Sequence, residues 1–207
     1  MTGRLRLKRL VKLGFLVIVL PFYGLYRVFS LVGNVDAAFQ SFSQMFSLVP
    51  GKMGVYSRAA FYHLACPDTS DEICIGFLTV MSHRDTTIGK GVYIGPQCNI
   101  GMCRIGENTL IGSGVHVLSG SHQHEITDLS RPIQEQGGRY EKVRIGADCW
   151  LGNGAIVMAD LADHCVLASG SVLVKHEAAK GTVLAGNPAK PVRNRFDEDS
   201  RQRRDGV

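Results

Sequence analysis

A six-residue repeat of aliphatic residues constrains the fold of this chain more than any other feature. Aliphatic residues recur six apart in four runs, at positions 88, 94 and 100, at 105, 111 and 117, at 145, 151 and 157, and at 161, 167 and 173. An α-helix repeats its faces every 3.6 residues, so this period excludes a helical face. A short strand followed by a corner fits, with three such units closing a triangular coil. The spacing predicts an all-β solenoid, a parallel β-helix with a narrow aliphatic interior.

Glycine directly follows most of the aliphatic residues in this region. Eight such pairs occur, namely Ile75-Gly76, Ile88-Gly89, Ile94-Gly95, Ile100-Gly101, Ile105-Gly106, Ile111-Gly112, Ile145-Gly146 and Leu151-Gly152. We interpret the second residue of each pair as one that must be small for the chain to turn.

The repeat is interrupted between Val117 and Ile145, where the sequence becomes polar. A long loop that leaves a rigid scaffold is a natural place for function, so we expect a functional loop over residues 121–142. The whole chain then divides into four parts: an N-terminal anchor or re-entrant segment (1–35), a helical cap (36–70), the catalytic β-helix (71–185) and a C-terminal tail (186–207).

Residues 1–35 combine a basic start with an apolar run from Leu13 to Tyr26. This run is shorter than the roughly 20 residues that a simple membrane span needs, and Pro21 is expected to kink a helix. Three interpretations stay open: a cleaved signal peptide, one tilted span over Val11–Val32, and a re-entrant or interfacial anchor. We favour the anchor, because it keeps the catalytic part on the basic, cytoplasmic face of a bacterial inner membrane.

Residues 39–64 carry apolar side chains at three- and four-residue spacing. This pattern predicts one or two amphipathic helices, broken at Pro50-Gly51. They are expected to cap the open end of the solenoid, to lie on a membrane surface, or to do both.

Charge and cysteine content limit the partners of the chain. The net charge is +5, and no basic stripe interleaves with aromatic residues along the middle, so we expect no nucleic-acid partner. The six cysteines include no C-x-x-C pair, and four lie inside the repeats. We therefore expect reduced, mostly buried thiols and a cytosolic location.

Four ordered sequence stretches resemble a known family. They are Ile111-Gly-Ser-Gly-Val-His-Val-Leu-Ser-Gly-Ser-His122, Ile145-Gly-Ala-Asp-Cys-Trp-Leu-Gly152 and, after Ala168-Ser-Gly-Ser-Val172, Gly186-Asn-Pro-Ala-Lys190. Over about residues 75–195 the chain is similar to the maltose, galactoside and xenobiotic acetyltransferases of the hexapeptide-repeat kind. Its first 70 residues look like those of membrane-associated exopolysaccharide acetyltransferases. The resemblance implies a left-handed parallel β-helix, a homotrimer with sites shared between neighbours, and acetyl-CoA as acyl donor without a metal.

His122 matches the family's active-site histidine, which implies that it is the general base. A hydroxyl that attacks a thioester must lose its proton as the bond forms, and an imidazole titrates near the working pH. His124 stays open as an alternative base, and His116 is expected to be structural or orienting. His63, His83, His164 and His176 are expected at the surface or in packing.

The resemblance also implies where coenzyme A and the acceptor bind. The matching cofactor positions are Asn153, Ser169, Val174, Lys175, Lys190 and Arg193, with the lysines and the arginine suited to phosphates. The acceptor-site asparagine of the family falls on Gly95, and its aspartate has no clear counterpart. We therefore do not expect a simple galactoside or maltose acceptor. The polar acceptor candidates near that position are Tyr93, Gln97 and Asn99, and His124 is a further candidate substrate residue.

These observations favour an acetyl-CoA-dependent O-acetyltransferase that modifies a lipid-linked or surface-polysaccharide sugar. A serine or amino-sugar N-acetyltransferase on the same fold stays open, since the base could be identical. A zinc hydratase that uses His116, His122 and His124 is less consistent with Lys175 and the Gly186–Lys190 motif. A non-catalytic, membrane-tethered scaffold is the remaining alternative.

Overall fold

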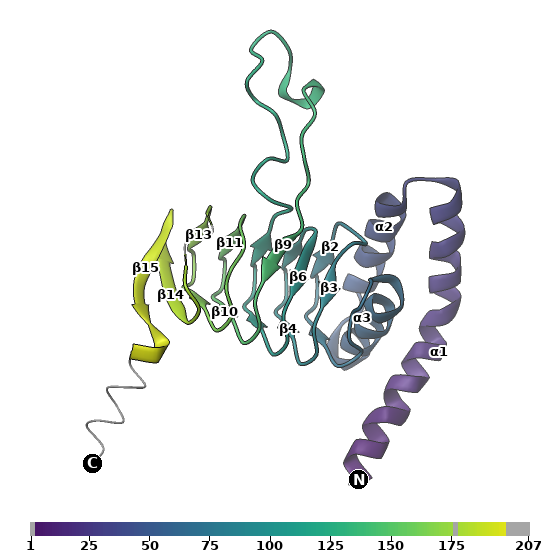
Figure 1. Ribbon diagram of the computed structural model, residues 1–207. Coiled ribbons are helices and arrows are strands. Elements are labelled where there is room, and N and C mark those ends of the chain that lie inside the picture. The colour runs from purple at the N-terminus through teal and green to yellow at the C-terminus, as the bar shows by residue number, and fades with distance from the viewer. Residues whose placement is uncertain (1–2, 176–177, 198–207) are drawn as a thin grey trace, which may run out of the picture.

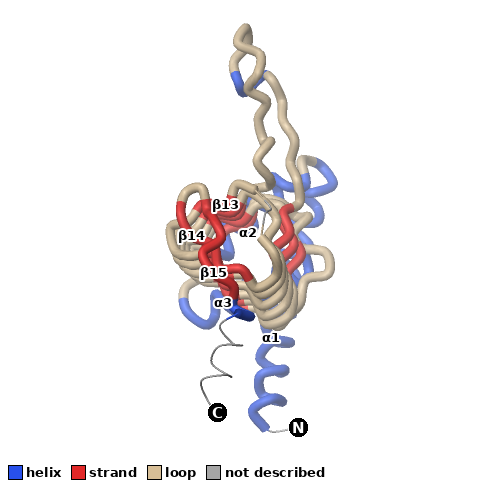
Figure 2. The backbone as a smooth tube through the Cα atoms, turned by 60° about the vertical axis from the view of Figure 1, so that its left-hand side comes forward, coloured by secondary structure: helices blue, strands red, loops and turns tan. Residues whose placement is uncertain are grey.

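Each six-residue unit forms a short strand and a turn, and three units complete one coil of a three-sided prism (Figure 1). The structure is a computed structural model that describes residues 3–175 and 178–197. Strands of successive coils pair in parallel and form one sheet on each side of the prism (Figure 2). The predicted parallel β-helix is therefore confirmed.

The first sheet contains β1 (Cys74–Ile75), β4 (Tyr93–Ile94), β7 (Leu110–Ile111), β10 (Trp150–Leu151), β12 (Val166–Leu167), β14 (Thr182–Gly186) and β15 (Ala189–Asn194). The second sheet contains β2 (Val80–Met81), β5 (Asn99–Ile100), β8 (His116–Val117), β11 (Ile156–Val157) and β13 (Val172–Leu173). The third sheet contains β3 (Thr87–Ile88), β6 (Cys103–Ile105) and β9 (Val143–Ile145).

Aliphatic side chains fill the prism in ladders, one ladder for each sheet. On the first sheet the ladder is in register from coil to coil and fully buried, in the order Ile75, Ile94, Ile111, Leu151, Leu167 and Leu184. The preceding residue of each of these strands points outward, because successive side chains of a strand alternate between its faces. The six-residue period thus corresponds to the spacing between the ladder residue of one side of the prism and that of the next side.

The glycines of the repeat allow the coils to stack closely. A Cβ atom on Gly76 would lie 2.4 Å from the backbone nitrogen of Pro96, and one on Gly106 would lie 2.4 Å from that of Ala147. Real Cβ atoms essentially never come so close to backbone. These glycines are therefore needed for the approach of the next coil, rather than for the turn itself as the sequence suggested.

The interruption of the repeat forms an arm that leaves the prism between β8 and β9 (Figures 1 and 2). Three backbone hydrogen bonds join its two sides: Glu141 N to Ser119 O, Arg139 N to His122 O, and Glu125 N to Gly137 O. A short 3-10 helix, η1 (Ile133–Glu135), lies farther out. The stem of this arm carries His122, as expected for the loop over residues 121–142.

Three helices cover the N-terminal end of the prism: α1 (Gly3–Val32), α2 (Val35–Ser47) and α3 (Gly51–Ala65). The side chain of Asn34 caps α2 by accepting hydrogen bonds from Asp36 N and Ala37 N. The predicted break at Pro50-Gly51 is confirmed, since Pro50 is the N-cap of α3. Pro21, where a kink was expected, lies inside α1, which spans 30 residues in total.

The buried Arg58 joins this cap to the first coil. Its guanidinium is fully buried and donates hydrogen bonds to Phe46 O (3.0 Å), Val49 O (2.8 Å) and Ile75 O (2.9 Å). Phe46 lies in the last turn of α2 and Val49 just beyond its end; Phe46 O also accepts from Val49 N at 3.3 Å. Burial lowers the pKa of this guanidinium from its usual value. Arg58 therefore donates to carbonyl oxygens of the cap and of the first strand together. All three of these partners are distant from Arg58 in the sequence.

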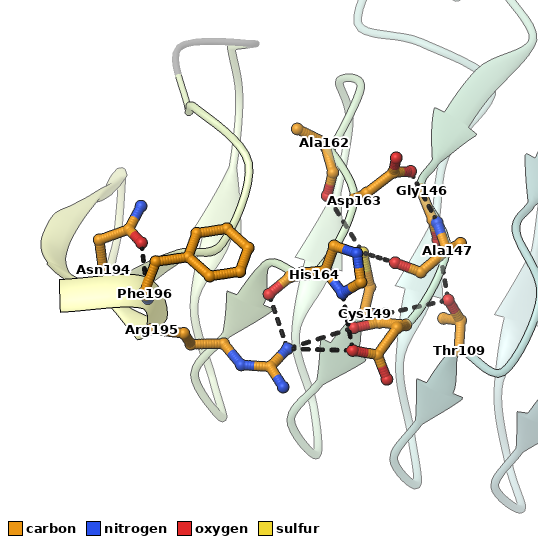
Figure 3. A network of polar contacts seen from close by, with 11 residues as sticks. Thr109, Gly146, Ala147, Cys149, Ala162, Asp163, His164, Asn194, Arg195 and Phe196 are labelled. Carbon is orange, nitrogen blue, oxygen red and sulfur yellow. Dashed lines mark hydrogen bonds and ion pairs between the residues drawn. The ribbon is translucent and has the colours of Figure 1, made fainter. Parts of the chain in front are cut away.

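The C-terminal end of the described chain closes with a hairpin of β14 and β15. Residues 189–194 thus belong to the first sheet, so the predicted tail over residues 186–207 begins as folded structure; residues 198–207 lie outside the described part. Arg195 donates to His164 O (2.8 Å), and the carboxylate of Asp148 lies 2.8 Å from His164 Nδ1 (Figure 3). The hydrogen bond between His164 and the carboxylate of Asp148, together with the charge of Arg195, lowers the pKa of Asp148.

Replacing Arg58 by methionine should lower the free energy of unfolding by about 2–4 kcal/mol, because buried carbonyls would lose their donor. Urea denaturation at one fixed protein concentration measures this change. Arg104→Met is the matched control, because Arg104 is exposed on the third sheet, and it should shift the transition by less than about 0.5 kcal/mol. Equal stability of the two variants would contradict the role given to Arg58.

Candidate active site

His122 lies at the base of the arm, just beyond the end of β8. Its Nδ1 is 3.2 Å from Ser121 Oγ and 3.8 Å from Glu141 Oε2, on the opposite side of the stem. The imidazole is 64% exposed, so a substrate can reach it. Backbone pairing of His122 with Arg139 holds this position, since His122 O accepts from Arg139 N at 2.8 Å.

A cavity of about 510 Å³ opens beside His122 on the C-terminal side of the arm. We call it the donor-side cavity; its lining residues are Gly120, Ser121, His122, Glu141, Lys142, Val143, Met158, Ala159, Asp160, Val174 and Lys175. It brings together the predicted base and two predicted cofactor residues, Val174 and Lys175. Met158 and Ala159 add an apolar wall, and the charged lining consists of two lysines, Lys142 and Lys175, and two carboxylates, Glu141 and Asp160.

The other four predicted cofactor residues lie farther along the prism. Asn153 and Ser169 occupy turns of successive coils at the corner between the first and second sheets, and Asn153 Oδ1 accepts from Ser113 N at 3.0 Å. Lys190 and Arg193 lie on β15. All six positions follow the arm in the chain, on the coils between β10 and β15, but within one protomer only two share the cavity of His122.

The three acceptor candidates are separated by the fold. Tyr93 lies on the first sheet, in a cavity of about 260 Å³ near Lys12 and Tyr56, and Gln97 lies in the following turn with a positive φ of 59°. Asn99 lies on the second sheet, directly between Val80 and His116 in the ladder. Of the three, only Asn99 is near the stem of the arm.

A second cavity, of about 830 Å³, lies on the N-terminal side of the arm. We call it the cap cavity; its lining residues are Asn34, Asp36, Ala37, Gln40, Ser82, His83, Asn99, Gly101, Met102, His116, Val117, Leu118, Ser119, Gln123 and Tyr140. It contains Asn99 and His116 together. The two cavities therefore flank the stem that carries His122.

The histidines considered for zinc do not converge. His116 lines the cap cavity, His122 lines the donor-side cavity, and His124 is exposed on the arm and lines neither. Within residues 3–175 and 178–197, no three His, Cys, Asp or Glu side chains are grouped so that they could hold a metal ion. His176 lies outside the described residues.

The cysteines are free thiols, and five of the six are buried. Burial raises the pKa of Cys103 and of Cys149 to about 12 each, and it also raises the pKa of Cys66, Cys74, Cys98 and Cys165. A thiol must be deprotonated to act as a nucleophile. The described structure thus keeps its cysteines in the inert form, as the sequence predicted for buried thiols.

Sequence reasoning missed several residues around His122. Glu141 reaches the imidazole only because the two sides of the arm pair, and a polar loop offers no periodic signal for that pairing. Tyr140 packs against His83 with ring centroids 4.9 Å apart, although 57 positions separate the two residues. Only the position of His83, two residues after the end of β2 and on the same side of the prism as Asn99, could have been predicted from the six-residue period.

A chloramphenicol acetyltransferase of Agrobacterium fabrum (strain C58 / ATCC 33970) is 38% identical over 169 residues, which cover 74% of this chain and 70% of that protein. The chain belongs to the hexapeptide-repeat acetyltransferases. In agreement, residues 142–175 match the family described as the hexapeptide repeat of succinyl-transferase. The predictions of this family and of an acyltransferase enzyme are confirmed.

Other relatives cover the chain less completely. The carnitine operon protein CaiE of Proteus sp. (strain LE138) is 28% identical over 130 residues, and the match spans 58% of this chain and 64% of that protein. The chain thus spans somewhat less than two thirds of this relative's length. A maltose O-acetyltransferase structure from Clostridium difficile 630 superimposes with a TM-score of 0.65 at 17% identity, over 78% of this chain and 89% of that one. This likeness concerns the fold, a left-handed β-helix in these hexapeptide-repeat proteins.

Alkylation should distinguish buried from accessible thiols. Iodoacetamide at pH 8 should modify Cys103 and Cys149 about 1,000-fold more slowly in the folded protein than in guanidinium, because three pKa units remove that share of thiolate. Peptide mass spectrometry over a time course measures each site, with the half-buried Cys74 as an internal comparison. Labelling of Cys103 or Cys149 at the unfolded rate would contradict the described core.

Proposed function

We propose that this protein is an acetyl-CoA-dependent O-acetyltransferase that acts on a saccharide hydroxyl, carried by a lipid or by a surface polysaccharide. The observation that carries the proposal is the donor-side cavity, where His122 and Lys175 meet at the base of the arm on a hexapeptide-repeat prism. Names of relatives such as the maltose O-acetyltransferase support the reaction class.

His122 acts as the general base in this proposal. Its Nδ1 faces Glu141 and Ser121, which assigns proton uptake to Nε2. The acceptor hydroxyl forms its bond to the acetyl carbonyl carbon as Nε2 takes the hydroxyl proton, and the carbon–sulfur bond then breaks. His122 returns the same proton to the departing thiolate, so no covalent enzyme intermediate is needed. The carboxylate of Glu141 stabilises the transient imidazolium.

The residues around His122 fit a thioester donor that carries phosphates. Acetyl-CoA would supply the acetyl group as a thioester. Val174, Met158 and Ala159 offer an apolar wall to its pantetheine arm, and Lys175 offers positive charge at the same cavity. Asn153, Ser169, Lys190 and Arg193 are proposed to contact the remainder of the cofactor, along the coils that follow the arm.

A homotrimer would bring these residues to one groove. In support, the first sheet presents a row of large apolar side chains that are exposed in the single chain: Tyr93 (41%), Leu110 (52%) and Trp150 (54%). They are neighbours in register on β4, β7 and β10. Adjacent exposed apolar side chains of this size are typical of a subunit interface.

Helix α1 is proposed to attach the enzyme to the cytoplasmic face of a bacterial inner membrane. One face of α1 packs on the cap through Val19 and Tyr26, whereas its other face exposes large apolar side chains along its length. The segment Arg6–Val32 is long and apolar enough to cross a membrane, yet Lys12 pairs with Asp71 of the prism at 3.1 Å. Because α1 is docked along this face, we propose that it lies in the membrane surface rather than across it.

Replacing His122 by alanine should reduce acetyl transfer by about 10²- to 10⁴-fold, the usual contribution of a general base. Release of free coenzyme A thiol in the presence of an acceptor glycan extract measures the rate. His124→Ala is the matched control and should retain most activity, because His124 lines neither cavity. A loss below tenfold in His122→Ala, together with an inactive His124→Ala, would transfer the role of base to His124.

The outer face of α1 should determine membrane binding. Changing Leu13, Val17 and Leu20 to asparagine should weaken binding to phosphatidylethanolamine–phosphatidylglycerol vesicles by more than about tenfold, since three exposed apolar side chains would no longer be buried in lipid. Vesicle flotation measures the bound fraction. The control Ser41→Asn/Gln44→Asn changes exposed positions of α2 and should bind as the wild type does. Detergent-free solubility of the full chain without vesicle binding would refute the attachment.

A further inference from the structure

The cap cavity has the composition of a binding site for an uncharged polyol. Its wall combines the amides of Asn34, Gln40, Asn99 and Gln123 with hydroxyl groups and two imidazoles. Its one carboxylate, Asp36, accepts a hydrogen bond from Arg84 N at 2.8 Å. None of its lining residues is a lysine or an arginine, so nothing in this wall would compensate an anionic ligand.

An aromatic platform forms one side of this cavity. The phenol ring of Tyr140 lies on the imidazole of His83, with centroids 4.9 Å apart and an angle of 54° between the rings. The Nδ1 of His83 is in turn 2.9 Å from Ser82 Oγ, which holds the imidazole in place. Aromatic rings present flat apolar faces, and the C–H faces of a sugar ring can pack on them while its hydroxyls contact the surrounding amides.

The cap cavity is also next to the base. Leu118, Ser119 and Gln123 line it, whereas Gly120, Ser121 and His122 line the donor-side cavity, so the stem of the arm forms the wall between the two. Gln123 Nε2 donates to Gly120 O at 3.1 Å and ties the two sides of this wall together. Gln123, which lines the cap cavity, thus directly follows His122 in the chain.

The helical cap supplies the remaining wall. Asn34 and Asp36 occupy the junction of α1 and α2, immediately after the end of α1, where Leu31 (83%) and Val32 (88%) are exposed. The opening of the cavity therefore adjoins the apolar end of the helix that we propose to lie in the membrane.

We infer that the cap cavity is the acceptor site, that it selects neutral sugar rings over acidic ones, and that Tyr140 with His83 is its platform. This inference rests on the proposed acetyl transfer and specifies its substrate class. It also gives the cap a role in specificity, because residues of α2 complete the site.

Saturation-transfer NMR on the full chain in nanodiscs tests the inference without requiring turnover. The probes are the methyl glycosides of glucose, galactose and mannose, with methyl glucuronide as the anionic comparison. Wild-type protein should bind at least one neutral glycoside more tightly than the glucuronide. Tyr140→Ala and Asn99→Ala should weaken that binding by about three- to tenfold, whereas Tyr140→Phe should retain it because the ring remains.

The same glycoside attached to a long alkyl chain and placed in vesicles distinguishes the two sources of the sugar. Tighter binding of this lipid-linked form identifies an acceptor in the membrane, and equal binding identifies a soluble one. Unchanged binding in both Tyr140→Ala and Asn99→Ala, or preference for the glucuronide, would overturn the inference.

His122→Ala separates this inference from the proposed reaction. That variant should bind the neutral glycoside as the wild type does and lose acetyl transfer. Glycoside binding that depends on Tyr140 in a wild-type protein with no transferase activity would support the site and refute the reaction. Acetyl transfer that is unaffected by Tyr140→Ala and Asn99→Ala would refute the site alone.

Discussion

The structure depends on how narrow the interior of the prism is. Each side buries one ladder side chain per coil, joined on some coils by a second buried residue two positions earlier, such as Val143 before Ile145, and the coils stack so closely that a Cβ atom at Gly76 or Gly106 would collide with backbone. Such packing leaves the wall few alternative positions. The two points from which the arm departs are therefore fixed, and the hydrogen bond from Glu141 N to Ser119 O continues that order into the stem. His122 follows three residues after Ser119, so the polar loop holds the proposed base on a rigid support.

A solenoid also has open ends. In this chain three helices cover the N-terminal end, and the buried guanidinium of Arg58 joins them to the first coil. Arg58 donates to the carbonyl oxygens of Phe46 in α2, of Val49 just beyond α2 and of Ile75 in β1, so it serves buried acceptors of the cap and of the first coil together. This contact fixes the end of α2 on the first coil. The start of α2 is held by a second contact, since Asp36 accepts a hydrogen bond from Arg84 N at 2.8 Å, and Asn34 and Asp36 therefore have a defined position at the cap cavity.

The parts of the fold that could be predicted are those with a local or periodic signal. The six-residue period predicts the coils, its interruption predicts the arm, and Pro50-Gly51 predicts the break between α2 and α3. Arg58 gave no signal, because its partners are set by tertiary packing. The period also predicts the separation of Tyr93 and Asn99, because residues six apart lie on adjacent sides of the prism. Asn99 and His116, in contrast, are one coil apart and lie side by side on the second sheet. The role of Glu141 could not be predicted, since it depends on how the arm pairs with itself.

The two cavities would allow the donor and the acceptor of the proposed reaction to bind at the same time. Direct transfer without a covalent enzyme intermediate needs donor and acceptor bound at the same time, on either side of one base. The stem of the arm provides that division, with one cavity on each side of it. The two walls differ in their polar groups. The donor-side cavity contains Lys142 and Lys175 together with the carboxylates of Glu141 and Asp160, and Lys142 Nζ pairs with Asp85 at 2.6 Å, so Lys175 is the lysine proposed to meet a phosphate. The wall of the cap cavity has no lysine or arginine and offers amides and rings instead. A phosphate placed there would find no such side chain to pair with, whereas a neutral sugar would find hydrogen-bond partners, which favours the proposed assignment of donor and acceptor to the two sides of the stem.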